Sequence, residues 1–321
     1  MTYFFIFVIS FIIVFLITPT IRYIGLKFYA IDRKNHRKIH KKIVTKLGGL
    51  AIYFGFLGGL IIAAVFDIDF FKVHIFQIMG LIICSTLMLI LGMYDDFQVS
   101  KALQKLVIQI MISLLLIKIG FSLQRIIIPG LIDINLGILS VPLTILWLIG
   151  ITNAINLIDG LDGLAAGIVS IAALFFCLYG FFLKENFVLF SSLALMGANL
   201  AFLKYNFYPA KIFMGDTGSL FLGFIIGALA IYRASPEDSN NLFFLPAVLV
   251  LLFPIMDIVF AFIRRILRKQ HIFRSDFSHI HHFFIKLGFK QVQIVKRFYF
   301  MTFCLGVASL VIIYAYLSQV N

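Results

Sequence analysis

The sequence predicts an all-α protein, a polytopic bundle of about ten membrane-spanning helices, and three observations support that prediction. Of the 321 residues, 62% are hydrophobic and 13% are charged, whereas a soluble domain is about half apolar and about a quarter charged. The mean hydropathy is +1.07. The apolar runs are continuous over about 20 residues, as a transmembrane helix requires, and do not alternate over about 10 as barrel strands do. These features exclude a cytosolic enzyme, a disordered chain and a secreted disulfide scaffold.

Polar residues mark the ends of the apolar runs, and together the runs predict one domain over residues 1–321. The first run lacks the basic leader and the small-residue cleavage site of a signal peptide. The third run ends before Asp95, the fifth ends before Asp159, and the eighth begins after Asp216. The expected spans are 2–22, 47–66, 74–93, 103–120, 138–155, 164–183, 187–204, 218–233, 242–262 and 298–317.

Basic residues predict an orientation with the N-terminus outside. In that orientation all but five of the 27 Lys and Arg residues lie in inner segments. The exceptions are Lys72, Lys118, Arg125, Lys184 and Arg233. Because the inner charge borders membrane spans, we expect it to meet lipid headgroups and anionic substrates, and not nucleic acid. The longest outer segment, 121–137, contains the turn formers Pro129-Gly130 and Asn135 and predicts a small hairpin.

Acidic residues gather at the predicted cytoplasmic ends of the spans. A secondary transporter places ionisable groups near the membrane midplane, so this placement favours an enzyme that acts on a lipid headgroup, with its active site on the cytoplasmic face. Two carboxylates 4 Å apart repel by about 4 kcal/mol at an effective dielectric of 20. Converging carboxylates therefore need protons or a cation, and oxygen donors without cysteine favour Mg²⁺ or Mn²⁺ over zinc.

The first candidate motif is Gly92-Met-Tyr-Asp95-Asp96, with Lys105 following at the start of the next span. Paired carboxylates at a helix end can hold a metal ion or act as a base. A lysine at the start of the neighbouring helix can pair with phosphate. An Asp-Asp turn that merely caps a helix is the alternative.

The second motif spans residues 153–164, where polar side chains recur every three residues. They are Asn153, Asn156, Asp159 and Asp162. Residues at this spacing stay on one side of a helix, and the glycines among them permit a ligand to approach the backbone closely. The alternative is a polar turn between two helices.

The third motif, Phe213-Met-Gly-Asp216-Thr217-Gly-Ser-Leu, opens the eighth span. Asp216 is a candidate metal ligand at a helix N-terminus, where phosphate also binds well. Alternatively, Asp216 or Thr217 caps the helix.

The fourth candidate lies in the last inner segment, which carries Arg264 and Arg265 and then His279-Ile-His281-His282. A basic, histidine-rich loop suits a pyrophosphate group. The histidines lack the usual spacing and second pair of a zinc site. Solvated loop residues are the alternative.

Together these motifs resemble the polyprenyl-phosphate N-acetylhexosamine-1-phosphate transferases of glycosyltransferase family 4, nearly from end to end. His-x-His-His resembles the undecaprenyl-phosphate GlcNAc-1-phosphate transferase branch, which starts teichoic acid, enterobacterial common antigen and O-antigen synthesis. The phospho-MurNAc-pentapeptide transferase branch has three adjacent histidines followed closely by Glu. One segment departs from the family, because Ile43-Val-Thr-Lys46-Leu-Gly-Gly replaces a Pro-x-Pro-Arg-x-Gly-Gly run.

The resemblance implies a reaction in the bacterial cytoplasmic membrane. N-acetylhexosamine 1-phosphate, with GlcNAc as the default sugar, would pass from a UDP-amino sugar to undecaprenyl phosphate with release of UMP, using Mg²⁺ or Mn²⁺. The resemblance implies metal binding for Asp216 and Asn156. It implies that Asp95 is a base or nucleophile, with Asp96 and Asp159 in the same site, and that Lys105 pairs with phosphate. It also implies uracil contacts for Asp162 and Phe213, and sugar-phosphate contacts for His279, His281 and His282. A homodimer is also suggested.

Two other functions stay open at this stage. A phospho-MurNAc-pentapeptide transferase would share the chemistry and take a larger donor. A membrane transporter or non-catalytic membrane protein would move substrate without releasing UMP. Direct attack by the lipid phosphate and a phospho-Asp95 intermediate are equally compatible with the sequence, although the ionised phosphate monoester favours direct attack.

Overall fold

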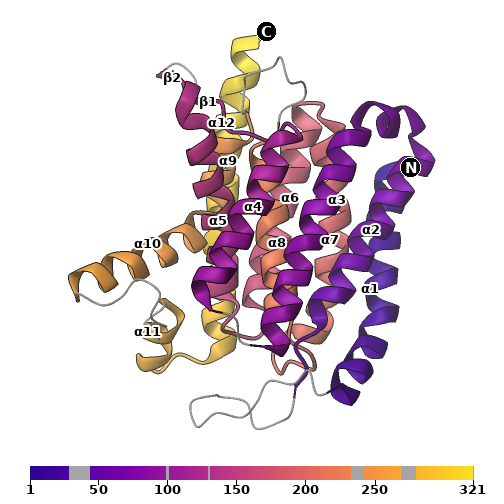
Figure 1. Ribbon diagram of the computed structural model, residues 1–321, viewed down its shortest axis with the longest axis vertical. Coiled ribbons are helices and arrows are strands. Elements are labelled where there is room, and N and C mark those ends of the chain that lie inside the picture. Colours follow the sequence, from indigo (N-terminus) through magenta and orange to yellow (C-terminus); the bar gives the residue numbers. More distant parts are fainter. Residues whose placement is uncertain (29–43, 99–100, 129–130, 233–241, 269–279, 321) are drawn as a thin grey trace.

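The computed structural model describes residues 1–28, 44–98, 101–128, 131–232, 242–268 and 280–320 and shows a bundle of helices with one short hairpin (Figure 1). The elements are α1 (Thr2–Lys27), α2 (Gly48–Phe66), α3 (Ile68–Phe97), α4 (Ala102–Lys118), β1 (Arg125–Ile128), β2 (Ile132–Asn135), the 3₁₀ turn η1 (Gly137–Leu139), α5 (Ser140–Ile158), α6 (Leu164–Phe182), α7 (Asn186–Asn206), α8 (Gly215–Ala230), α9 (Phe244–Val250), α10 (Leu252–Leu267), α11 (Ile280–Lys286) and α12 (Gln291–Val320).

Both chain termini and the hairpin lie at one end of the bundle, at the top of Figure 1. The end of α3, the start of α4, the end of α5 and the start of α8 lie together at the opposite end. This arrangement brings the acidic motifs of the sequence to one end of the molecule, as predicted.

Each of the ten expected spans coincides with a helix or a helix pair. Seven helices are long and apolar enough to cross a membrane, or eight if the bent pair of α9 and α10 is counted as one span. The protein is therefore a multi-pass membrane protein, although the count of ten is not established. Both α4, with 17 residues, and α8, with 16, are shorter than the seven.

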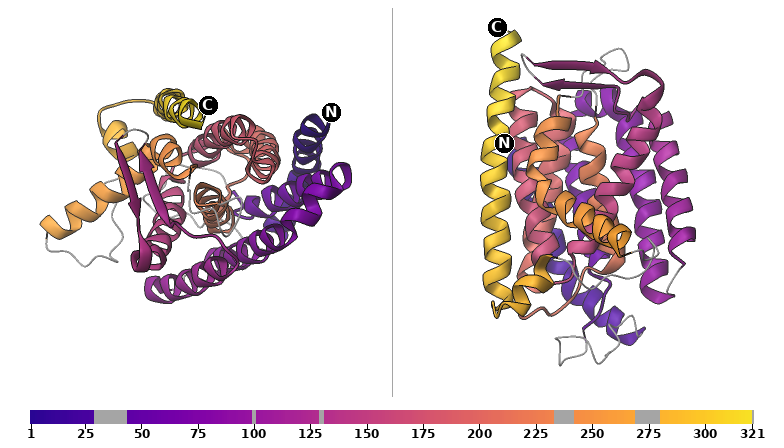
Figure 2. Two further views of the ribbon diagram at one scale, coloured as in Figure 1. Left: turned by 90° about the horizontal axis from the view of Figure 1, so that it is seen from above. Right: turned by 90° about the vertical axis from the view of Figure 1, so that its left-hand side faces the viewer.

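The expected span over 242–262 consists of two helices and not of one. The helices α9 and α10 meet at a bend of 73°. Pro254, in the first turn of α10, has no N–H for the carbonyl of Val250, and its ring crowds that carbonyl. As a result α10 leaves the bundle sideways (Figures 1 and 2).

Helix α8 passes through the centre of the bundle, with other helices around it (Figure 2). All of its residues from Thr217 to Ala230 are buried. Small residues let neighbouring helices approach it closely; at Gly49, for example, an added Cβ would overlap the backbone of Gly218. The first turn of α8, which carries Asp216, is thus fixed by the protein interior.

The hairpin predicted within 121–137 is confirmed. Strands β1 and β2 pair antiparallel, with Arg125 opposite Asn135. The Arg125 guanidinium binds the Asp133 carboxylate through Nε at 2.5 Å and through a terminal nitrogen at 2.6 Å. Tyr316 of α12 donates to the Ile127 carbonyl at 2.6 Å and so ties the last helix to this end.

Candidate active site

Three predicted site residues from three helices meet at the end of the bundle opposite the hairpin. The Lys105 ammonium, on the first turn of α4, lies 3.2 Å from Oδ2 of Asp95 on α3. It also forms an ion pair with Asp216 on α8. All three side chains are partly buried; Asp95 and Lys105 belong to the first motif of the sequence and Asp216 belongs to the third.

Asp96, adjacent to Asp95, points at the backbone of α8. Its Oδ1 accepts the amide of Asp216 at 3.1 Å, and its Oδ2 accepts the amide and the hydroxyl of Thr217 at 2.9 and 2.7 Å. The first amides of a helix lack partners within the helix, so Asp96 caps α8 from another helix. At Gly215, where φ is +68°, an added Cβ would overlap the Lys46 carbonyl and the Asp96 carboxylate.

Side-chain amides join α4, α5 and α8 behind the charged groups. Nδ2 of Asn156 donates to Oγ of Ser219 at 2.8 Å, one turn along α8 from Asp216. Nδ2 of Asn153 donates to Oε1 of Gln109 at 2.9 Å. Gln109 is buried one helical turn after Lys105, a role that the sequence analysis missed because the partner lies 44 residues away.

Asp159 follows α5 and completes a group with Asp95, Asp96 and Asp216 that we call the acidic cluster. Desolvation raises the pKa of Asp159 well above its usual range, and the charges of Asp216, Asp96 and Asp162 raise it further. The charge of Lys46 acts in the opposite direction. Added positive charge would therefore stabilise the ionised form of this cluster.

Asp162, for which the resemblance implied a uracil contact, lies in the connection between α5 and α6. Its side chain is 2% exposed, and its Oδ2 accepts the amide of Ala210 at 2.9 Å. The buried Asn206 accepts the amide of Gly163 at 3.1 Å and donates to the carbonyl of Ile212 at 3.0 Å. These bonds fasten the α5–α6 and α7–α8 connections to each other.

Phe213 lies beside the acidic cluster and remains partly exposed. Its amide donates to the Thr45 carbonyl at 2.8 Å, and its carbonyl accepts the amide of Gly48 at 3.0 Å. The segment that lacks the family's prolines thus docks on the start of α8 through its backbone. Lys46 lies in this docked segment, and its charge opposes the rise in the pKa of Asp159.

The basic and histidine-rich motif lies on α10 and α11. Arg264 and Arg265 occupy the last turn of α10 and are half-buried. His282 is half-buried on α11, whereas His279 and the side chain of His281 lie outside the described part of the chain. Helix α10 packs against α5, whose last turn carries Asn156.

The donor atoms of the cluster fit a hard divalent cation, because they are carboxylate and amide oxygens without sulfur. Among the residues that the structure describes, no three His, Cys, Asp or Glu side chains form a ready-made metal site. The Lys105 ammonium instead lies between Asp95 and Asp216. Asp216 and Asn156, at the start of α8 and the end of α5, offer a carboxylate and an amide oxygen that could bind such a cation.

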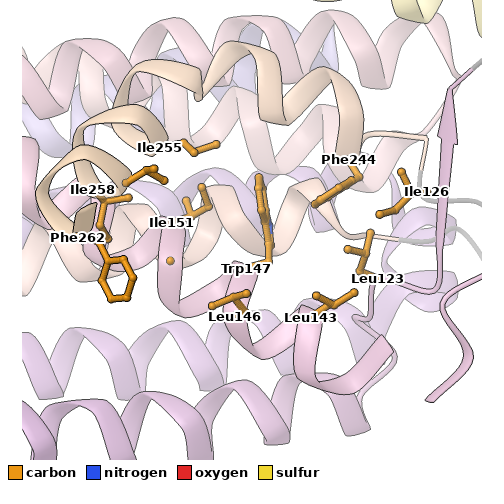
Figure 3. A pocket seen from close by; sticks show the side chains of 12 residues that line it. Leu123, Ile126, Leu143, Leu146, Trp147, Ile151, Phe244, Ile255, Ile258 and Phe262 are labelled. Atoms are coloured by element: carbon orange, nitrogen blue, oxygen red, sulfur yellow. The ribbon is translucent and has the colours of Figure 1, made fainter. Parts of the chain in front are cut away.

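An apolar cavity of about 520 Å³ lies between α5, α9, α10 and the start of the hairpin (Figure 3). Side chains from all of these elements line it, including Trp147 and Ile151 of α5, Phe244 of α9, and Ile255, Ile258 and Phe262 of α10. From Ile151, helix α5 continues for five residues, about 8 Å at 1.5 Å per residue, to Asn156. Helix α5 therefore lines the apolar cavity at Ile151 and reaches the charged site at Asn156.

Comparison with known proteins gives matches over most of the chain. The family described as "Glycosyl transferase family 4" matches residues 78–234, which contain the acidic cluster. A probable undecaprenyl-phosphate N-acetylglucosaminyl 1-phosphate transferase of Bacillus subtilis is 37% identical over 307 residues, 95% of this chain and 84% of its own length. A decaprenyl-phosphate N-acetylglucosaminephosphotransferase of Mycolicibacterium smegmatis is 32% identical over 90% of this chain and 76% of its own. A phospho-N-acetylmuramoyl-pentapeptide-transferase of Clostridium beijerinckii is 36% identical over 66% of this chain and 64% of its own.

Proposed function

The chain belongs to glycosyl transferase family 4, and we propose that it transfers N-acetylglucosamine 1-phosphate from UDP-N-acetylglucosamine to undecaprenyl phosphate. An oxygen of the lipid phosphate forms a bond to the β-phosphorus of the donor. The bond from that phosphorus to the bridging oxygen breaks, and UMP leaves. The lipid-linked sugar pyrophosphate then starts a cell-surface glycopolymer in a bacterial cytoplasmic membrane.

One observation carries this proposal: Lys105, Asp95 and Asp216 meet at the end of a membrane bundle, and α5, which packs against α4 and α8, also lines an apolar cavity. A reaction between a lipid phosphate and a nucleotide sugar needs a polar centre and an apolar place for the lipid chain. The distribution of basic residues supports a cytoplasmic location for this end, where the nucleotide sugar would be available.

The charged residues have distinct proposed roles. Both substrates are anions that repel each other, so positive charge is needed where they meet. Lys105 pairs with phosphate oxygens when it leaves its carboxylate partners. Asp216 and Asn156 would hold Mg²⁺, which supplies further charge stabilisation when bound. Asp95 orients Lys105, and Asp96 holds the first turn of α8.

The remaining predicted residues are proposed to bind the substrates. The partly exposed ring of Phe213 would stack on the uracil, and Asp162 would support that region from behind. Arg264, Arg265, His279, His281 and His282 would contact the sugar pyrophosphate. The apolar cavity would hold part of the polyprenyl chain, because its lining is almost wholly hydrocarbon. The homodimer stays a prediction.

The test uses the purified protein with undecaprenyl phosphate, Mg²⁺ and a panel of UDP-amino sugars. We expect UMP and a lipid-linked product with UDP-N-acetylglucosamine, and loss of both when EDTA removes the metal. Turnover with UDP-MurNAc-pentapeptide alone would support the peptidoglycan transferase, which the 36% identical relative keeps as the second candidate. Flux of substrate into vesicles without UMP release would contradict both enzymes.

A further inference from the structure

Two carboxylate side chains, those of Asp162 and Asp257, are buried in the described part of the chain. Each accepts a hydrogen bond from the backbone of a segment that is distant in sequence. Asp162, 2% exposed, accepts the amide of Ala210. Asp257, 1% exposed, lies on α10 and accepts the amide of Ile280 through Oδ1 at 2.8 Å. Ile280 is the first residue of α11 and the second residue of the His-Ile-His-His motif. Asp257 has no role in the proposed function described above.

The bond between Asp257 and Ile280 satisfies two groups that are otherwise costly to bury. A carboxylate inside a protein needs hydrogen-bond donors, and Asp257 occupies the buried face of α10 between Phe253 and Ala261. The first amides of a helix have no partner within it. Asp257 therefore caps the histidine-bearing helix across 23 residues of sequence.

Aromatic packing fixes a second point on the same helix. Phe284 of α11 packs edge-on against Phe298 of α12, with ring centres 5.6 Å apart. Phe298 stacks on Phe253, one turn before Asp257 on α10, at 4.2 Å. Helix α11 is thus held to α10 at its start by a polar bond and in its middle through Phe298.

Helix α10 also forms one wall of the apolar cavity through Ile255, Ile258 and Phe262. The side chains that line the cavity and the carboxylate that holds α11 therefore project from one helix. A change at Asp257 removes the anchor of α11 and leaves the cavity lining in place. The two contributions of α10 can be separated by mutation.

We propose that Asp257 is a positioning residue that fixes the start of α11, and with it His282 of the His-Ile-His-His motif, for contact with the sugar pyrophosphate of the donor. The inference rests on the proposed function for the identity of that donor. Asp257 acts through the histidines and touches neither substrate. Its loss therefore weakens use of the donor and leaves use of the lipid acceptor unchanged.

The test compares Asp257→Ala and Asp257→Asn with Asp67→Ala in the full-length protein. Asp67 makes the same kind of bond, to the amide of Phe70 at 2.9 Å, at the opposite end of the bundle. For Asp257→Ala we expect the KM of UDP-N-acetylglucosamine to rise about tenfold, as for loss of a helix cap, with an unchanged acceptor KM. Asp257→Asn should be intermediate, because its amide oxygen still accepts a hydrogen bond. Asp67→Ala should leave both KM values unchanged.

Amide hydrogen exchange supplies a readout that does not depend on activity. In Asp257→Ala, exchange should become faster in the peptide that begins at Ile280 and stay unchanged at the start of α3. Unchanged exchange at Ile280, or an equal change in the two KM values, would overturn the proposal. If the Ala variant does not fold, exchange and kinetics of Asp257→Asn decide. Absence of UMP release by the unmutated protein would reject the proposed function, while exchange would still show whether Asp257 anchors the segment.

Discussion

The acidic cluster and α11 lie toward the same end of the bundle, α10 leaves the bundle near its mid-height, and the two regions are held in different ways (Figures 1 and 2). The cluster stands on the ends of helices that pack into the bundle, and its members bind one another's helices directly, as Asp96 binds the first turn of α8. Helix α10 instead leaves the bundle at a 73° bend. Helix α11 depends on one distant carboxylate and on aromatic contacts.

This difference separates two requirements of a transferase. Groups that stabilise charge must be held within a fraction of an ångström, which packed helix ends do better than separately held segments. Groups that bind a sugar can tolerate larger displacements, so the segment that carries them can be held by fewer contacts. If the division is functional, the rate constant depends on the first region and substrate affinity depends on the second.

The largest effect is expected for Lys105→Ala. The substitution removes the cation that binds both Asp95 and Asp216, and loss of one electrostatic stabiliser lowers kcat by about 10²–10³-fold. Initial rates of UMP release and the size-exclusion profile would measure activity and folding together. Lys101→Ala is the matched control, because Lys101 is exposed at the preceding turn and should leave the rate unchanged. Equal losses in both variants would mean that general positive charge, and not the position of Lys105, matters.

A smaller effect is expected for Asp96→Ala. Three hydrogen bonds to the first turn of α8 disappear, so the protein should lose about 1–2 kcal/mol of stability, as for other helix caps. The kcat should fall about tenfold because Asp216 is less firmly held, and Asp96→Asn should recover part of both losses. Thermal unfolding and initial rates measure the two effects.

The control for Asp96 is Asp69→Ala, which removes an exposed carboxylate 3.8 Å from Lys72. Exposed ion pairs contribute about 0–1 kcal/mol, so little should change. A fall in kcat as large as that of Lys105→Ala without any loss of stability would place Asp96 in the chemistry itself, and the two adjacent aspartates would then share one role.

Local signals predicted the elements of this fold, and distant partners decided what the site residues do. Continuous apolar runs and turn formers predicted the ten apolar helical segments and the hairpin, because such signals act over neighbouring residues, whereas the short helix α11 was expected to be a loop. The bend before α10 was missed, although Pro254 was a visible signal for it.

The sequence predicted which motifs form the site, but it predicted less well what each residue in those motifs does. Asp95 and Asp96 are equivalent in sequence, yet one binds Lys105 and the other caps α8, since their partners come from elements up to about 120 residues away. The burial of Asp162 and the contributions of Gln109 and Asn206 also depend on such distant contacts. Neither spacing nor residue type contains that information.

The smallest effect is expected at Gly150, which lines the apolar cavity and would have nothing within 4 Å of an added Cβ. Gly150→Leu adds a side chain at the cavity that the polyprenyl chain is proposed to use, and its Cβ would meet no protein atom within 4 Å. The acceptor KM should rise about fivefold, or about 1 kcal/mol, while the donor KM stays constant, which is the reverse of the pattern expected for Asp257→Ala. Gly150→Ala is the graded control and should have a smaller effect in the same direction. If Gly150→Leu raised the donor KM instead, the cavity would serve the nucleotide sugar, and the division between the two faces of α10 would be wrong.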